Sequence, residues 1–301
     1  MTDKAAGERE KSSQRPTLAA LPLSIARSEL FSVAAGGGWY KAREIPTAKK
    51  GINASIIYTG QHLTMEHLKA WQALVYLADR ENALGGDGFV VPMAEVLRLM
   101  GKKPVAMNST QRKQFWQLLT DLRATSITIR SNGLSYMGGL IDEAIRDDAT
   151  HLVRVRIGKE IATGLLDREI LRNDLDRMMG FGRHHFAIWL HGFISSQASR
   201  KDKQVARHTF EVDEIRRLCG SKAKERIHFV QDMSRALDKL KTGERPLVKD
   251  WGWCDEAKRK VWADKTHTLV KVIGESAQVA KSKRAESAAQ AARSRKTRVQ
   301  L

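Results

Sequence analysis

A glycine turn between two amphipathic segments occurs twice in this chain, and the repetition restricts the folds that the chain can adopt. The stretch LRLMGK at residues 97–102 matches RRLCGS at residues 216–221. Glycine ends a helix without steric cost because it readily takes the left-handed backbone conformation. A helical pattern precedes each turn, and another follows it. The two stretches therefore predict two copies of a helix-turn-helix.

The order of predicted elements around the two turns is also the same. The first copy predicts a helix at 68–80, a strand at 89–91, helices at 92–101 and 109–123, and a hairpin that turns at Asn132-Gly133. The second predicts a helix containing Trp189, a strand at 209–210, helices at 212–219 and 222–241, and a hairpin at 246–264. This order is that of a winged helix. We therefore predict an α+β fold, a duplicated winged helix-turn-helix that forms two tandem winged-helix domains.

Composition sets the predicted domain boundaries. Residues 1–25 are predicted to be a disordered N-terminal segment, 26–165 the first winged-helix domain, 166–268 the second, and 269–301 a disordered basic tail that adds non-specific DNA affinity. Gly36–Gly38 and the basic residues after them, up to Lys50, are predicted to be a flexible linker. This glycine run lacks the Lys-Ser/Thr ending of a phosphate-binding loop.

The predicted helix at 222–241 has two different faces, with Ser221 as its expected N-cap. One face is apolar and predicted to be buried; it comprises Phe229, Val230, Met233, Ala236, Leu237 and Leu240. The opposite face carries Lys224, His228, Gln231 and Arg235, and Lys222 precedes it. Such a row suits insertion into the major groove of DNA. It is equally typical of an exposed helix in a basic protein.

Two further groups of residues are candidates for DNA contact. In the first domain, the exposed face of the helix at 109–123 carries Thr110, Lys113 and Gln117, and Lys102 and Lys103 precede that helix. With one strong base and one acid, Asp121, on this face, the first domain is expected to position the protein and the second to specify sequence, with base reading by Lys113 and Gln117 as the open alternative. In the second domain, the hairpin has Lys258, Arg259 and Lys260 near its tip, where they are expected to contact phosphate. The hairpin's tryptophans are expected to pack on the helices.

The overall charge favours a polyanionic partner. Lys and Arg total 52 against 34 acids, which gives a formal net charge of +18. No run of roughly 18 apolar residues suggests a membrane span, and the first residues lack the apolar core of a signal peptide. Cys219 and Cys254 are the only cysteines, so we expect a reducing cytoplasmic location rather than a disulfide scaffold.

Three alternative functions are weighed against the residues: a nicking endonuclease, a transcriptional repressor, and a partition or chromosome-architecture protein. A nicking endonuclease needs a tyrosine with a metal-bound histidine pair, but His184 and His185 are adjacent, so their rings diverge. No zinc spacing, nucleophile elbow or Walker sequence is present, so we expect no catalysis, cofactor or metal. A transcriptional repressor, possibly of its own gene, would use the same fold and differ only in its target. A partition or chromosome-architecture protein would discriminate little between sequences.

The stretch HLVRVRI at residues 151–157 alternates as a β-strand does. Its valines and isoleucine are predicted to face one way, and Arg154 and Arg156 the other. We expect either an edge strand that pairs with a second copy, forming a dimer in equilibrium with a monomer, or pairing only within its own sheet.

The motifs of this sequence also resemble a known family. ARSELF (26–31), IIYTG (56–60) with Leu63 and the pair Trp71-Gln72, FVVPMAEVLRLMG (89–101), and RRLCGS (216–221) with the ungapped helix to Leu240 are similar to the TrfA-type plasmid replication initiators. The likeness spans Ala26 to Trp253. The short glutamine-leucine-phenylalanine motif by which some relatives contact the sliding clamp is not present near this N-terminus, and the basic tail lies outside the matched region.

The resemblance implies two winged-helix domains that bind repeated origin sequences (iterons) on double-stranded DNA. It also implies opening of adjacent AT-rich DNA, recruitment of the bacterial host's replicative helicase and initiator, and no catalysis. The helix from Lys222 to Leu240 would be the specificity helix of the second domain. Dimers would pair through the first domain, and monomers would bind iterons.

Overall fold

The computed structural model describes residues 17–48, 54–102, 108–131, 134–162, 170–197, 206–242 and 246–265. Its first winged-helix unit contains α2 (Met65–Arg80), β4 (Phe89–Pro92), α3 (Met93–Leu99), α4 (Ser109–Arg123), β7 (Ile141–Arg146) and β8 (Leu152–Ile157). The second contains α7 (His185–Ser195), β10 (Ala206–Glu211), α8 (Val212–Leu218), α9 (Arg226–Lys241), β11 (Val248–Trp253) and β12 (Lys260–Lys265).

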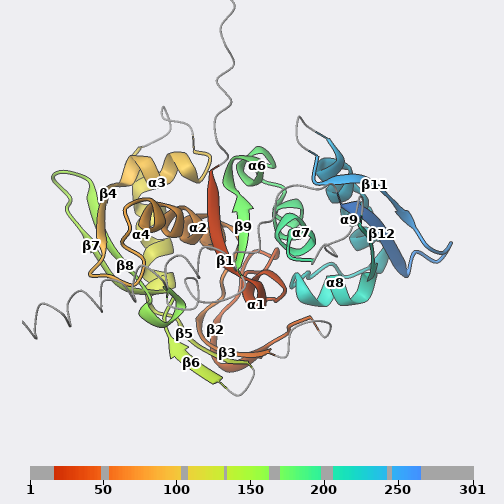
Figure 1. Cartoon of the computed structure of the whole chain (residues 1–301), viewed down its shortest axis with the longest axis horizontal. Coiled ribbons are helices and arrows are strands. Elements are labelled where there is room, and N and C mark those ends of the chain that lie inside the picture. Colours follow the sequence, from red (N-terminus) through yellow and green to blue (C-terminus); the bar gives the residue numbers. More distant parts are fainter. Residues whose placement is uncertain are drawn as a thin grey trace, which may run out of the picture.

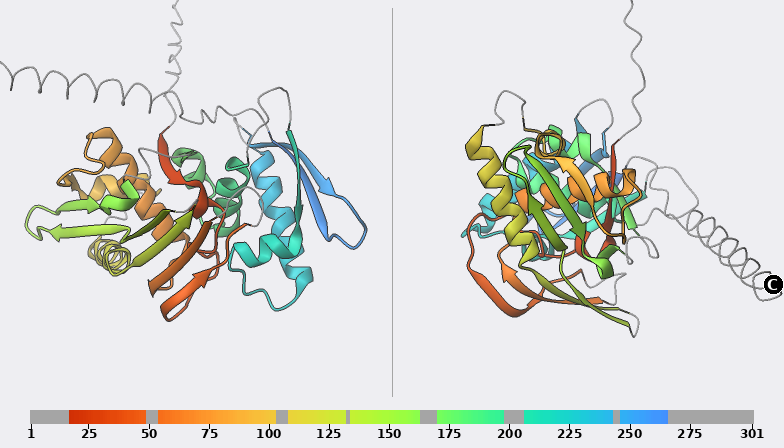
Figure 2. Two further views of the ribbon diagram at one scale, coloured as in Figure 1. Left: turned by 60° about the horizontal axis from the view of Figure 1, so that its bottom comes forward. Right: turned by 90° about the vertical axis from the view of Figure 1, so that its left-hand side faces the viewer.

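The two units have the same sheet topology. The antiparallel strand orders are β4-β8-β7 and β10-β12-β11, so in both the strand before the helix-turn-helix pairs with the last strand of the wing. The units lie at opposite ends of the molecule, and their wings project away from each other (Figures 1 and 2). The predicted α+β fold with two tandem winged-helix domains is confirmed.

The glycine turns behave as predicted. Gly101 and Gly220 have φ angles of +76° and +64°, in the left-handed region that favours glycine. A side chain at position 220 would also collide with Ser32 and Glu29, which lie against the turn. Gly220 is therefore required both for its backbone conformation and for the close approach of the N-terminal segment.

A third, four-stranded sheet corrects two predictions. Its strands are β2 (Trp39–Ile45), β3 (Ala54–Gln61), β5 (Ser126–Ser131) and β6 (Leu134–Gly138), in the order β2-β3-β5-β6. The hairpin predicted to turn at Asn132-Gly133 corresponds to β5 and β6 of this sheet, whereas the wing of the first unit is β7–β8. The predicted basic linker is in part a strand, because β2 pairs antiparallel with β3.

The N-terminal segment joins the two units. The strand β1 (Leu18–Pro22) pairs antiparallel with β9 (Ile170–Asp174), which is followed by α6 (Leu175–Gly180); α1 (Leu23–Ala26) packs against α7. The prediction of disorder over residues 1–25 was therefore wrong for residues 18–25. The remaining stretch 1–16 and the predicted tail at 269–301 lie outside the described residues.

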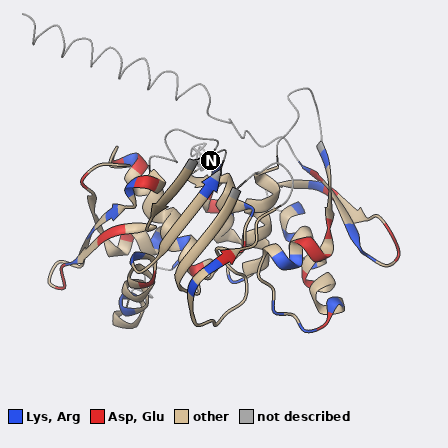
Figure 3. Ribbon diagram, turned by 90° about the horizontal axis from the view of Figure 1, so that it is seen from below, with Lys and Arg blue, Asp and Glu red and all other residues tan. Residues whose placement is uncertain are grey.

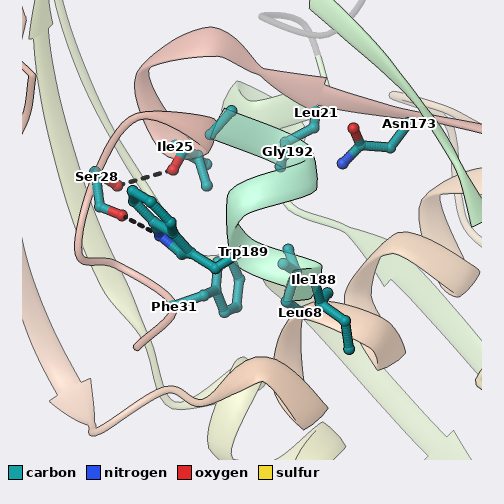
Figure 4. A pocket seen from close by; sticks show the side chains of 10 residues that line it. Leu21, Ile25, Ser28, Phe31, Leu68, Asn173, Ile188, Trp189 and Gly192 are labelled. Atoms are coloured by element: carbon teal, nitrogen blue, oxygen red, sulfur yellow. Dashed lines mark hydrogen bonds between the residues drawn. The ribbon is translucent and has the colours of Figure 1, made fainter. Parts of the chain in front are cut away.

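Buried contacts hold the N-terminal segment against α7. Trp189 Nε1 donates to Ser28 O at 3.3 Å, and the Arg27 side chain donates to Ser196 Oγ at 2.9 Å and to Ser196 O. A small cavity of about 10 Å³ lies beside Trp189, Ser28 and the buried Asn173 (Figure 4). This volume suffices for about one water molecule.

The strand β8 decides between the two predicted pairings in favour of pairing within its own sheet. Val153, Val155 and Ile157 are buried as predicted. However, β8 is the central strand of its sheet and pairs with β4 on one side and β7 on the other. Its backbone hydrogen-bonding groups face partners on both sides, so it cannot pair with a second copy.

Candidate DNA interface

The helix α9 begins later than predicted. It starts at Arg226 with Glu225 as N-cap, rather than at Lys222 with Ser221 as N-cap. The segment before it is a turn, because the Arg216 guanidinium donates to the carbonyl of Ala223 and Lys222 Nζ donates to Gly36 O at 2.6 Å. Lys222 and Lys224 are exposed on this turn and not on the helix.

The two faces of α9 match the predicted pattern. All six predicted apolar residues are buried, and His228, Gln231 and Arg235 are exposed. His228 Nε2 lies 3.4 Å from Glu225 Oε2, and Arg235 Nη2 lies 2.8 Å from Asp232 Oδ1. Exposed pairs of this kind contribute little to stability, so the basic side chains can exchange them for contacts with DNA.

The wing turn of the second unit is fixed to the start of α9. Arg226 donates to the carbonyls of Ala257 (3.0 Å) and Lys258 (2.7 Å), both in the turn between β11 and β12. Its Nε also lies 3.6 Å from Asp213 Oδ1 at the start of α8. The guanidinium of Arg226 thus joins the start of α9 to the wing turn and to the start of α8. Arg226 was not among the predicted site residues, because it faces neither the apolar core nor the predicted base-reading row.

The three basic residues predicted at the wing tip do lie there, with different partners. Lys258 has a φ of +53° and places Nζ 5.8 Å from the centroid of the Trp253 ring. Arg259 pairs with Asp255 at 3.3 Å, and Lys260 pairs with Glu211 at 3.1 Å. Within the described chain, the Lys258 ammonium is the one of these three that makes no ion pair.

The prediction that the tryptophans of this wing pack on the helices is supported for Trp251, whereas Trp253 and Trp262 make ring contacts with residues of the sheet and the wing turn. Trp251 Nε1 donates to Asp238 Oδ1 of α9 at 2.9 Å, and its ring meets that of Trp253 edge-on at 5.8 Å. The guanidinium of Arg207 lies 4.0 Å from the Trp262 ring centroid. Trp251 therefore ties the wing to the last turn of α9, while Arg226 ties it to the beginning.

In the first unit, α4 presents the predicted face. Asn108 is its N-cap and accepts from Gln111 N at 2.9 Å, and Thr110, Lys113 and Gln117 are exposed. The Gln117 amide donates to Asp121 Oδ1 at 2.9 Å, so it shares that carboxylate with His67 of α2. Lys103 lies outside the described residues.

Lys102 is committed to a charge cluster that the sequence did not reveal. Glu66 accepts from Lys69 (2.7 Å) and Lys102 (3.0 Å), and His185 of α7 lies 3.6 Å away. Burial alone would raise the pKa of Glu66, but hydrogen bonds from His185, Lys69 and Lys102 hold it well below its usual range. The cluster links α2 of the first unit to α7 of the second. Lys102, predicted as a DNA contact, donates its hydrogen bond within this cluster.

Basic and acidic residues are interspersed along the described ribbon in the view of Figure 3. No group of three or more histidine, cysteine or carboxylate side chains in the described ranges is placed to hold a metal ion. No helix among the described residues is long and apolar enough to span a membrane.

Neither family models nor curated proteins match this sequence. Among solved structures, domains 2 and 3 of RctB are 14% identical, with a TM-score of 0.54, covering 81% of this chain and 98% of that one. A second structure of RctB domains 2–3 has 15% identity, a TM-score of 0.49, and coverage of 79% and 95%. The Pi initiator protein in complex with iteron DNA has 14% identity, a TM-score of 0.48, and coverage of 71% and 98%. At these identities the first match shows a shared fold that extends over both units.

Proposed function

We propose that this protein is a plasmid replication initiator that binds repeated origin sequences on double-stranded DNA. One observation carries the proposal: the chain holds two winged-helix units, and in the second unit Arg226 joins the start of α9 to the wing turn that carries Lys258 and Arg259. A helix that reads bases and a wing that contacts phosphate must be held in register, and this contact holds them.

The two units are suited to different tasks. The face of α9 and the turn before it carry Lys224, His228, Gln231 and Arg235, whose side chains can pair with base edges or phosphates. The face of α4 has Lys113 as its strong base, with Thr110 and Gln117 beside it. We infer that the second unit specifies the sequence and that the first unit positions the protein on the duplex. Because the units lie at the two ends of the long axis (Figure 1), each can contact a separate segment of DNA.

The likeness to TrfA-type initiators extends the proposal to the steps after binding. We infer that the bound protein promotes opening of neighbouring AT-rich DNA and recruits the host's replicative helicase and initiator in a bacterial cytoplasm. No catalytic step by this chain is part of the proposal. A monomer–dimer equilibrium remains part of it, with an interface other than β8.

The test is a plasmid that carries only this gene and its neighbouring repeats. An initiator sustains replication of that plasmid and binds tandem direct repeats. With about 6–10 phosphate contacts, its affinity for the repeat should fall roughly 10³–10⁵-fold between 50 and 200 mM salt. A protein that binds an inverted repeat over a promoter and supports no replication would be a repressor, and the proposal would be wrong.

A further inference from the structure

Ile227 is exposed at a place where an apolar side chain has no structural use. It lies in the first turn of α9, and 60% of its surface is exposed. The other large apolar residues that are similarly exposed in the described ranges lie on or beside strands: Trp39, Val90, Met137 and Ile145. Among the described residues, Ile227 is therefore the one such residue on α4 or α9.

Its position on the helix sets it apart from the core. The buried face of α9 begins at Phe229 and Val230, whereas Ile227 lies on the side of Gln231, which follows it by four residues. Residues four apart are neighbours on one helix face, with about 5–6 Å between their Cβ atoms. The first turn of a helix favours acidic residues because of the helix dipole, yet this first turn contains none. Neither packing nor helix stability explains an isoleucine here.

The surroundings of Ile227 indicate what it faces. The preceding residue, Arg226, fixes this turn of the helix beside the wing turn that carries Lys258 and Arg259. The first residues of a recognition helix are those that reach base edges when the helix enters the major groove. Ile227 thus lies between a phosphate-contacting element and Gln231, whose amide can recognise adenine.

Resting on the proposed function, we propose that Ile227 is a specificity residue that recognises thymine through the C5 methyl group. Isoleucine has no hydrogen-bonding atom in its side chain, so it cannot read the donors and acceptors of the other bases. The thymine methyl is the apolar group that unmodified base pairs present in the major groove. Contact between the two removes apolar surface of both from water. The spacing places this thymine within one or two base pairs of the base read by Gln231.

The test removes single methyl groups from the DNA. The wild-type protein first selects its preferred duplex from random sequences, and each thymine of that duplex is then replaced by deoxyuridine. We expect one or two positions at which the replacement weakens wild-type binding about fourfold, the factor for one buried methyl group. The Ile227→Ala protein should bind the thymine and deoxyuridine duplexes equally at those positions. Val90→Ala is a matched control, because Val90 is 59% exposed on β4, and this variant should keep the wild-type discrimination.

The outcomes separate this inference from the proposed function. If the wild type selects a sequence but Ile227→Ala keeps its discrimination against deoxyuridine, or if no replacement weakens wild-type binding, Ile227 does not read thymine. If Ile227→Ala instead changes only the sedimentation of the free protein, Ile227 is a contact between copies, and the assignment is wrong. A wild type that selects no sequence would refute the proposed function as well.

Discussion

Replacing Arg226 with alanine tests whether the wing and the recognition helix act as one unit. The substitution removes the hydrogen bonds to the carbonyls of Ala257 and Lys258 and leaves the apolar face of α9 intact. Because Trp251 still holds the wing to Asp238, we expect the domain to stay folded while the wing turn loses its fixed position beside the helix.

The size of the effect follows from the exposure of the guanidinium. A hydrogen bond to a charged group contributes about 1.5–3 kcal/mol, but the Arg226 side chain is 36% exposed, so we assign about 1 kcal/mol to each of the two bonds. A wing destabilised by about 2 kcal/mol corresponds to roughly 30-fold weaker binding. In the folded protein Arg226 donates to the wing carbonyls and is not expected to contact a phosphate itself. A change in the salt dependence of binding in the Arg226→Ala variant would therefore mean that the wing no longer reaches its phosphates. Each phosphate that the wing fails to neutralise lowers the slope of log K against log salt by about 0.9.

The assay is a titration of the selected duplex at several salt concentrations, with Arg207→Ala as the control. Arg207 lies on β10, in the same sheet as the wing strands, and its side chain donates two hydrogen bonds of 2.9 and 3.2 Å to Asp264. Its replacement by alanine removes the same charge as Arg226→Ala without freeing the wing turn. We expect Arg226→Ala to weaken binding and to reduce the salt slope by the amount that corresponds to about one to three phosphates. Arg207→Ala should do much less. Equal effects of the two variants would mean that only net charge matters, and the proposed positioning role of Arg226 would be refuted.

Three further predictions concern stability and sequence reading. Burial lowers the pKa of His191 from 6.5 to about 3, so the unfolded chain binds a proton before the folded chain does, and the free energy of unfolding falls as the pH drops below 6.5. In denaturant titrations, His191→Phe should reduce the loss of unfolding free energy between pH 8 and pH 5 by about 2 kcal/mol. Glu66→Gln should cost about 1–3 kcal/mol at pH 7 because the buried Lys69 loses its carboxylate, and a cost that does not shrink below pH 4.5, where the pKa of an ordinary glutamate lies, would contradict the charge cluster. Gln231→Ala should cost about 1–3 kcal/mol at one base pair only, whereas deleting residues 271–301 should weaken binding to all duplexes alike, as competition assays with variant duplexes would show.

The sequence was sufficient to predict those features that depend on local periodicity. The apolar spacing of α9 identified its six buried residues, and the alternation in β8 identified Val153, Val155 and Ile157 as buried. The glycines at 101 and 220 located both turns, because few other residues accept a positive φ. These patterns depend on a few neighbouring residues, so they predict local structure without knowledge of how distant segments pack.

The errors arose where distant segments decide the structure. Alternation in β8 shows which side chains are buried, but it does not show whether the strand's two edges are paired, and here both are. The pairing of β1 with β9 joins residues about 150 positions apart, and no local pattern reports it. The start of α9 was misplaced because the carbonyl of Ala223, which a helix would use, accepts from Arg216 instead.

The N-terminal segment also connects the helix-turn-helix of the second unit to the first unit. Val33 N donates to Cys219 O at 2.9 Å, Ser32 Oγ donates to Gly220 O at 3.1 Å, and Lys222 reaches Gly36 O. These contacts hold the turn between α8 and α9 from outside its own domain, immediately before the chain enters β2 of the four-stranded sheet. A displacement of β2 and β3 would therefore be transmitted to the segment that sets the start of α9. We therefore expect the orientation of α9 to depend on residues of the N-terminal segment, far from it in sequence, and, under the proposed function, the two units to bind DNA as coupled parts rather than as independent modules.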